Sequence, residues 1–143
     1  MRVLLLVAIF ALCSGACAGR SPGFVTVGPE AWAVTLAPED VGAMAYFERL
    51  VVALEAAGED PPAVLLALDG WLAAEGEAAS AASAALSARL LALPSFERQA
   101  HEEALRQAAE PLWERFRAVR RYLLEHDPNV ARAFFDRIGS LQE

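Results

Sequence analysis

The sequence predicts an all-α protein: an up-down helical bundle of four to five helices that follows a signal peptide and a short extended tether. Three observations predict this class. Apolar residues recur at helical spacing from about residue 38 onward. Proline, glycine and aspartate interrupt these stretches, as is typical of helices joined by short turns. Alanine, the best helix former, supplies 31 of the 143 residues, and leucine supplies 20 more.

The first twenty residues predict export. Arg2 is followed by Val3–Leu12, an apolar run of ten residues that has the length of a signal-peptide core. The whole uncharged stretch between Arg2 and Arg20 is 17 residues long, which is the lower limit for a membrane-spanning helix. A cleaved leader is therefore expected, and an uncleaved anchor is the weaker alternative.

Residues 14–17, with the sequence Ser-Gly-Ala-Cys, resemble the lipobox of bacterial lipoproteins. The resemblance covers the leader alone, and no family is identified for the mature domain. It implies cleavage before Cys17, acylation of that cysteine and attachment to a membrane of the bacterial cell envelope. By the same resemblance, Ala18 in place of aspartate favours the outer membrane, on its periplasmic side. The alternative is cleavage after Ala18 by an ordinary signal peptidase, which yields a secreted or periplasmic soluble protein.

The cysteine positions agree with a lipid anchor. Both cysteines, Cys13 and Cys17, lie in the leader, so the chain after them has no thiol for a disulfide, a zinc site or a nucleophile. Glycine and proline are frequent in the next twenty residues, which suits a tether. We expect Trp32 in this tether to cap the core, or alternatively to lie at a lipid interface. The predicted domains are a signal peptide (1–16), a tether (17–37) and a helical bundle (38–143).

Two helices are predicted in the first half of the bundle. The first spans 38–57, with Pro38 in its first turn, Gly58 as its stop, and an apolar face made of Val41, Met44, Phe47, Val51 and Leu54. The second spans 61–93, with Asp60 as N-cap and a kink or break near Gly76. Its apolar residues are Val64, Leu65, Leu68, Trp71 and Leu72, and an alanine- and serine-rich tract follows them.

The second half is predicted to contain two or three helices. Ser95 is a suitable N-cap, and the residues expected to line one side after it are Phe96, Ala100, Ala104 and Ala108. Pro111 predicts a kink or a new start. An apolar stripe then continues through Leu112, Phe116, Val119 and Leu123. Asp127 and Pro128 predict the start of the last helix, which carries Val130, Phe134 and Ile138.

Composition and motifs exclude several function classes. The formal net charge of −7 disfavours nucleic-acid binding, which needs a basic face. The two histidines, His101 and His126, lack a Glu-x-x-His partner, so no metal site and no cofactor are expected. No nucleophile elbow and no glycine-rich phosphate loop occurs, and we therefore expect no enzymatic activity.

One local charge pattern departs from the acidic average. Four of the 12 arginines fall within seven residues: Arg115, Arg117, Arg120 and Arg121. Arginine binds carboxylates and phosphates well, so these residues are the candidate partner-binding surface. The alternative is local neutralisation, because Glu114 and Glu125 lie at helical spacing from Arg117 and Arg121.

These observations predict a non-catalytic cell-envelope lipoprotein that binds an envelope protein partner, as an accessory or assembly factor. The alternative is a small-ligand carrier or an enzyme that uses a cavity between the helices.

Overall fold

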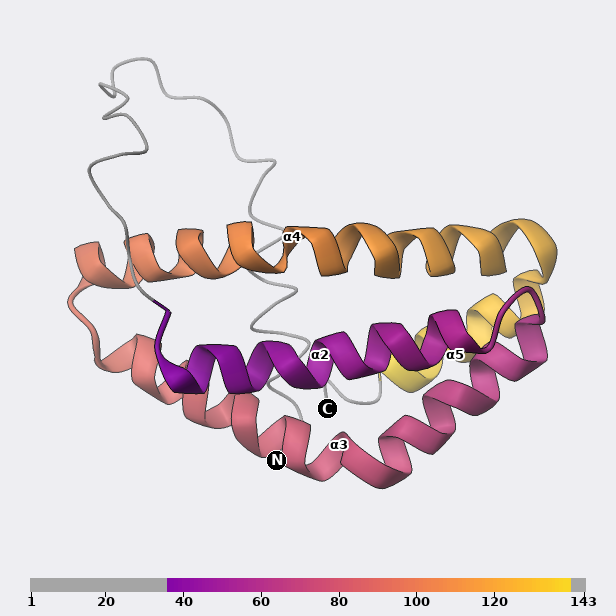
Figure 1. The fold of residues 1–143 in the computed structure, drawn as a ribbon, viewed down its shortest axis with the longest axis horizontal. Coiled ribbons are helices and arrows are strands. Elements are labelled where there is room, and N and C mark those ends of the chain that lie inside the picture. The colour runs from indigo at the N-terminus through magenta and orange to yellow at the C-terminus, as the bar shows by residue number, and fades with distance from the viewer. Residues whose placement is uncertain (1–35, 140–143) are drawn as a thin grey trace, which may run out of the picture.

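The computed structural model describes residues 36–139, and over this range the protein is an all-α bundle of four helices: α2 (Pro38–Ala56), α3 (Pro61–Ala92), α4 (Ser95–His126) and α5 (Pro128–Gly139). Consecutive helices run in opposite directions (Figure 1), so the up-down topology predicted from the short turns is confirmed. The predicted signal peptide and tether, with Cys17 and Trp32, lie outside the described residues.

Local capping chemistry explains some of the helix starts and not others. Asp127 caps α5, because its Oδ1 accepts hydrogen bonds of 3.0 Å from the N–H groups of Asn129 and Val130. Asp60 occupies the N-cap position of α3, as predicted, although its side chain makes no capping hydrogen bond. The N-cap prediction for Ser95 is wrong by one position. The carbonyl of Pro94 accepts the first helical hydrogen bond of α4, and this places Ser95 inside the first turn.

Glycine ends α2 where the sequence predicts it. Gly58 has a φ of 71°, in the left-handed region that a glycine adopts without a steric penalty. Its N–H donates to the carbonyl of Glu55 at 3.0 Å, which satisfies one of the last carbonyls of the helix. The chain then turns within four residues into α3.

Helix α3 is continuous through Gly76, so the break considered there does not occur. The helix is clearly bent near its middle (Figure 1), which agrees with the alternative of a kink near Gly76. The alanine- and serine-rich tract is helical, and Ala79, Ser83 and Leu86 within it are buried. Packing of this tract against the other helices offsets the low helix propensity of the glycine.

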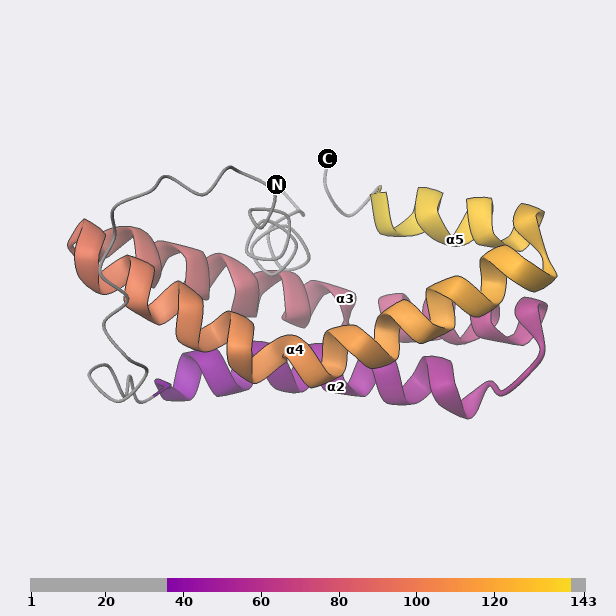
Figure 2. The ribbon, with the colours of Figure 1, turned by 90° about the horizontal axis from the view of Figure 1, so that it is seen from above.

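Helix α4 is also continuous, and the new start considered at Pro111 is wrong. Pro111 is exposed, while Ala109 before it and Trp113 after it are both buried. A proline removes one helical hydrogen bond, and α4 is bent near its middle (Figure 2), which agrees with the kink predicted at Pro111.

One residue of the predicted apolar face of α2 lies outside the core. Val41 is 52% exposed, because it lies six residues before Phe47 and so faces away from it at 100° per residue. The buried hydrophobic residues of the helix are Ala43, Phe47, Leu50, Val51 and Leu54.

The side of α4 predicted to be lined by small residues is not the buried one. Phe96 is 61% exposed and Ala108 is exposed. The buried residues of α4 are Leu105, Ala109, Trp113, Phe116 and Leu123. The helix therefore turns its large leucine and aromatic side chains inward, since these bury more apolar surface than the alanines do.

Aromatic rings join three helices at the centre of the core. The ring of Phe47 on α2 lies 4.8 Å from that of Trp113 and 5.8 Å from that of Phe116, both on α4. Phe116 in turn lies 6.0 Å from Phe134 on α5. Figure 2 shows α5 against only one half of the length of α3 and α4, so this aromatic group marks the four-helix half of the bundle.

Candidate functional site

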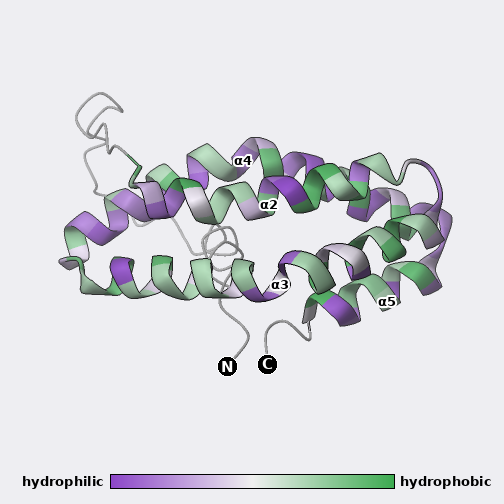
Figure 3. Cartoon of the chain, turned by 60° about the horizontal axis from the view of Figure 1, so that its bottom comes forward, coloured by the Kyte–Doolittle hydropathy of each residue, from purple (hydrophilic) through white to green (hydrophobic). Residues whose placement is uncertain are grey.

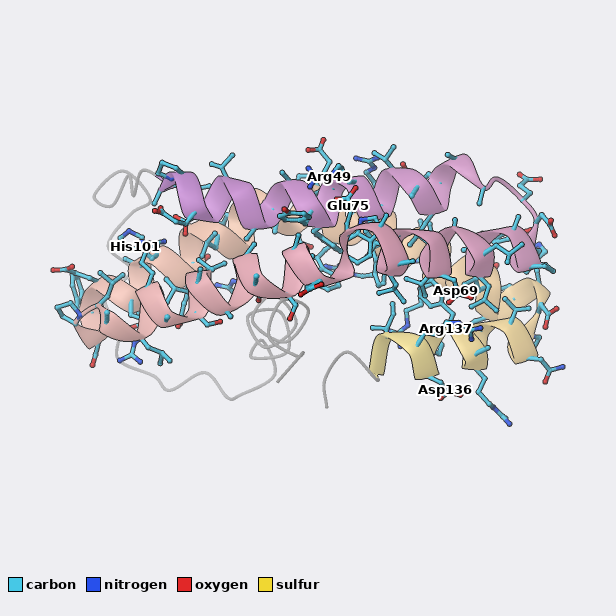
Figure 4. All side chains as sticks on the ribbon, turned by 90° about the horizontal axis from the view of Figure 1, so that it is seen from below. Arg49, Asp69, Glu75, His101, Asp136 and Arg137 are labelled. Atoms are coloured by element: carbon cyan, nitrogen blue, oxygen red, sulfur yellow. The ribbon has the colours of Figure 1, made fainter. Side chains whose placement is uncertain are left out.

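Arginines join the helices at four places. Arg49 on α2 pairs with Glu75 on α3 at 2.6 Å, and Arg137 on α5 pairs with Asp69 on α3 at 2.5 Å (Figure 4). Two further pairs join α2 to its neighbours: Arg89–Asp40 and Arg115–Glu55. The paired residues are 26 to 68 positions apart in the sequence. These pairs could therefore not be predicted from the spacing of charged residues within one helix.

The four arginines predicted as a partner-binding surface, here called the arginine segment, separate into two pairs. Arg115 donates two hydrogen bonds to the carboxylate of Glu55, at 2.9 and 2.5 Å. Arg117 contacts Glu110 at 2.9 Å and Glu114 at 2.7 Å, so the local pairing with Glu114 is confirmed. The first two arginines of the segment are thus already bound to carboxylates of the same chain.

The other two members, Arg120 and Arg121, are exposed on the last three turns of α4. The guanidinium of Arg120 lies 4.9 Å from the ring centre of Phe135 on α5, a cation–π contact. Among residues 36–139, Arg121 forms no ion pair, and the pairing considered with Glu125 is absent. Arg120 and Arg121 are therefore the part of the segment whose donors are available to an acidic partner.

The pair between Arg115 and Glu55 affects the titration of both groups. Hydrogen bonding from Arg115 lowers the pKa of Glu55, and the same bond raises the pKa of Arg115. A carboxyl group whose pKa is lower in the folded state than in the unfolded state stabilises the fold at a pH above its unfolded-state pKa. This stabilisation is lost as the pH falls through the folded-state pKa. Because both side chains are about 40% exposed, water screens the pair and its effect on stability is small.

The most deeply buried charge in the described residues is Asp40, in the first turn of α2. Its side chain is fully buried and contacts Arg89 on α3, whose side chain is 25% exposed. The other carboxylate oxygen accepts a 2.6 Å hydrogen bond from the N–H of Ala37, just before the helix. Asp40 therefore holds the N-terminus of α2 in place and binds the last turn of α3 at the same time.

Three buried donors on α3 have no hydrogen-bond partner among the described residues: Trp71 Nε1, Ser83 Oγ and Arg89 Nε. Trp71 and Ser83 are separated by about 18 Å along a regular helix, and Ser83 and Arg89 face directions about 120° apart. The three donors consequently do not converge on one place. They do not form a polar site for a single small ligand.

Both histidines form hydrogen bonds to backbone carbonyl groups of their own helix. Nδ1 of His101 lies 3.0 Å from the carbonyl oxygen of Glu97, and Nδ1 of His126 lies 2.9 Å from that of Tyr122. Each nitrogen therefore donates to the preceding helical turn. Across residues 36–139, no three side chains of the His, Cys, Asp and Glu types lie close enough together to hold a metal ion. Within the same range, no helix combines the length and the apolar character that crossing a membrane needs.

Comparison with family models, with curated proteins and with solved structures found no match for the chain. No catalytic family is therefore indicated, and the function must be inferred from the residues themselves.

Proposed function

We propose that the chain is a lipoprotein of the bacterial cell envelope, anchored through Cys17, and that its helical bundle binds a protein partner without catalysing a reaction. The observation that carries the proposal is the placement of Cys17. It follows an apolar run and two small residues, and no cysteine occurs after it. A thiol at that position can carry a lipid anchor, whereas the bundle contains no cysteine that could form a disulfide, bind a metal or act as a nucleophile.

The described part of the bundle supports a binding role over a catalytic one. Its one fully buried carboxylate among the described residues, Asp40, is already paired with Arg89 of the same chain. A carrier or an enzyme in the bundle interior would need polar groups that converge on one ligand. The buried donors of α3 are instead spread along the helix.

The exposed end of the arginine segment indicates the chemistry of the partner. Arg120 and Arg121 present guanidinium groups on a chain that is acidic overall. Guanidinium groups bind carboxylates in a bidentate geometry, so the partner surface is expected to be acidic. Such contacts are exposed and therefore sensitive to salt.

Replacing Cys17 by serine tests the anchor. The Cys17→Ser chain is expected to leave the membrane fraction as a soluble protein, or to accumulate as an unprocessed precursor, because it lacks the thiol that is acylated. Membrane fractionation, together with the mass of the mature protein, measures this. A Cys17→Ser chain that fractionates and migrates as the wild type does would contradict the anchor.

Replacing Arg120 and Arg121 by glutamine tests the binding surface. The partner that co-purifies with the membrane-anchored wild type at low salt is expected to be recovered at least tenfold less with the double variant, if each lost contact contributes about 1 kcal/mol. High salt is expected to reduce recovery with the wild type in the same way, since the Debye length falls to about 3 Å at 1 M.

The matched control is an Arg98→Gln and Arg106→Gln double variant, which makes the same charge change in the first half of α4. It is expected to recover the partner as the wild type does. Equal recovery from the wild type and the Arg120/Arg121 variant at both salt levels would leave these arginines as solvated surface and would remove the binding site from the proposal.

A further inference from the structure

Arginines without an ion pair are concentrated in the hairpin that α4 and α5 form. Over residues 36–139, six of the ten arginines contact carboxylates of the same chain. Within this range the four arginines that form no ion pair are Arg98, Arg120, Arg121 and Arg132. Arg98 lies in the first turn of α4, whereas the other three lie in the last turns of α4 and the first turns of α5.

Two of these arginines lie along a seam between the helices. The cation–π contact of Arg120 with Phe135 shows which sides of α4 and α5 face each other. Leu124 follows Arg120 by four residues and Arg132 precedes Phe135 by three, so each shares a helix side with its neighbour. Because the two helices are antiparallel, Leu124 and Arg132 both lie about one turn nearer to the α4–α5 turn. These four residues are called the seam below.

The carboxylates of the hairpin lie outside the seam. Glu125 and Asp136 each follow a seam residue by one position, so each is turned by about 100° around its helix. Asp136 lies on the side of α5 that is turned away from α3 (Figure 4). Asp127 accepts the hydrogen bonds that cap α5. The hairpin as a whole therefore carries both signs of charge, whereas the seam carries positive charge alone.

Apolar surface accompanies the charge in the seam. Leu124 is 48% exposed, and the ring of Phe135, against which Arg120 lies, is half-buried. Hydrophilic and hydrophobic residues alternate along α5 (Figure 3). An exposed leucine and two exposed guanidinium groups thus lie on one side of the hairpin.

We propose that the partner of the bundle places an acidic segment along this seam, with carboxylates on Arg120 and Arg132 and an apolar side chain on Leu124. This inference rests on the proposed binding function and extends its surface from α4 onto α5. Guanidinium groups bind carboxylates in a bidentate geometry, and none on this chain occupies the two arginines of the seam. Arg120 is already held against the ring of Phe135, so it loses less side-chain freedom when the partner binds.

The seam separates Arg120 from Arg121. Arg121 is turned by about 100° from Arg120 and lies four residues before Glu125, on the same side of α4 as that carboxylate. A segment in the seam therefore contacts Arg120 and Arg132 across the two helices, and Arg121 lies at its edge.

The test uses the full lipidated chain in nonionic detergent and a fluorescent synthetic peptide of alternating glutamate and leucine. Fluorescence anisotropy measures the dissociation constant, Kd. Arg132→Gln and Arg120→Gln are each expected to raise the Kd about fivefold, since each removes one charge-assisted contact, and Arg121→Gln is expected to raise it less. The matched control is Arg98→Gln, which removes another arginine without an ion pair among the described residues and is expected to leave the Kd unchanged.

The apolar contact has its own variants. Leu124→Ser is expected to weaken binding of the glutamate–leucine peptide, and a peptide of alternating glutamate and serine is expected to bind the wild type more weakly. Leu66→Ser is the control, at a leucine on α3 that is 71% exposed, and is expected to bind as the wild type does. The helical circular dichroism signal verifies that each variant is folded.

A wild-type chain that does not bind the glutamate–leucine peptide overturns the proposal, and so does an Arg132→Gln chain that binds it as tightly as the wild type. Equal binding of a lysine–leucine peptide also overturns it, because apolar contact alone then accounts for the affinity. Co-purification with the Arg132→Gln lipoprotein separates this inference from the proposed function. If the Arg120/Arg121 double variant loses the partner and Arg132→Gln retains it, the partner binds α4 alone and only the extension onto α5 fails.

Discussion

Replacing Phe116 by aspartate is expected to destabilise the bundle strongly. Phe116 is 2% exposed, and its ring lies within 6.0 Å of the ring centres of Phe47, Trp113 and Phe134. The substitution removes the ring from three aromatic contacts and places a carboxyl group among them, at a cost of about 4 kcal/mol or more. A domain of this size is stable by about 5–15 kcal/mol, so the loss is a large part of the total.

The measurement for Phe116→Asp is the helical circular dichroism signal as urea or temperature increases. Phe96→Asp is the matched control, because it makes the same substitution in the same helix at a residue that is 61% exposed. The control is expected to change the free energy of unfolding by under about 1 kcal/mol. Equal effects of the two substitutions would contradict the packing of α4 described above.

Removing Arg89 is expected to destabilise the bundle strongly at neutral pH. Asp40 is fully buried, and in an Arg89→Met chain its only described hydrogen bond would come from the N–H of Ala37. Breaking a buried ion pair by removing one partner leaves an uncompensated charge in the interior, at a cost of about 3–5 kcal/mol. The Arg89→Met chain should therefore be less stable than the wild type by a similar amount.

The measurement is the free energy of unfolding in urea at neutral pH, for the wild type and for Arg89→Met. A double variant, Asp40→Leu with Arg89→Met, tests the cause. It removes both charges and is expected to recover most of the lost stability. A double variant that is no more stable than Arg89→Met would show that the methylene packing of Arg89, and not the charge of Asp40, is responsible.

Most helix boundaries could be predicted because they depend on neighbours in the sequence. Asp127 caps α5 through residues two and three positions away, and Gly58 ends α2 through its own backbone conformation. Proline at the first position of a helix acts equally locally. The candidate site was only partly predictable for the same reason. The Glu114–Arg117 pair is a local contact, whereas Arg115 binds Glu55 across 60 residues.

The sequence by itself determined the helical class, the positions of the turns and the expectation that Cys17 carries an anchor, because each depends on residues within a few positions of one another. The tertiary structure decided the rest. It keeps α3 and α4 continuous through Gly76 and Pro111, turns Val41 and Phe96 outward, and buries Asp40 against Arg89. For the buried residues the deciding contacts come from other helices, and the free energy of packing there exceeds the local preference of a single residue.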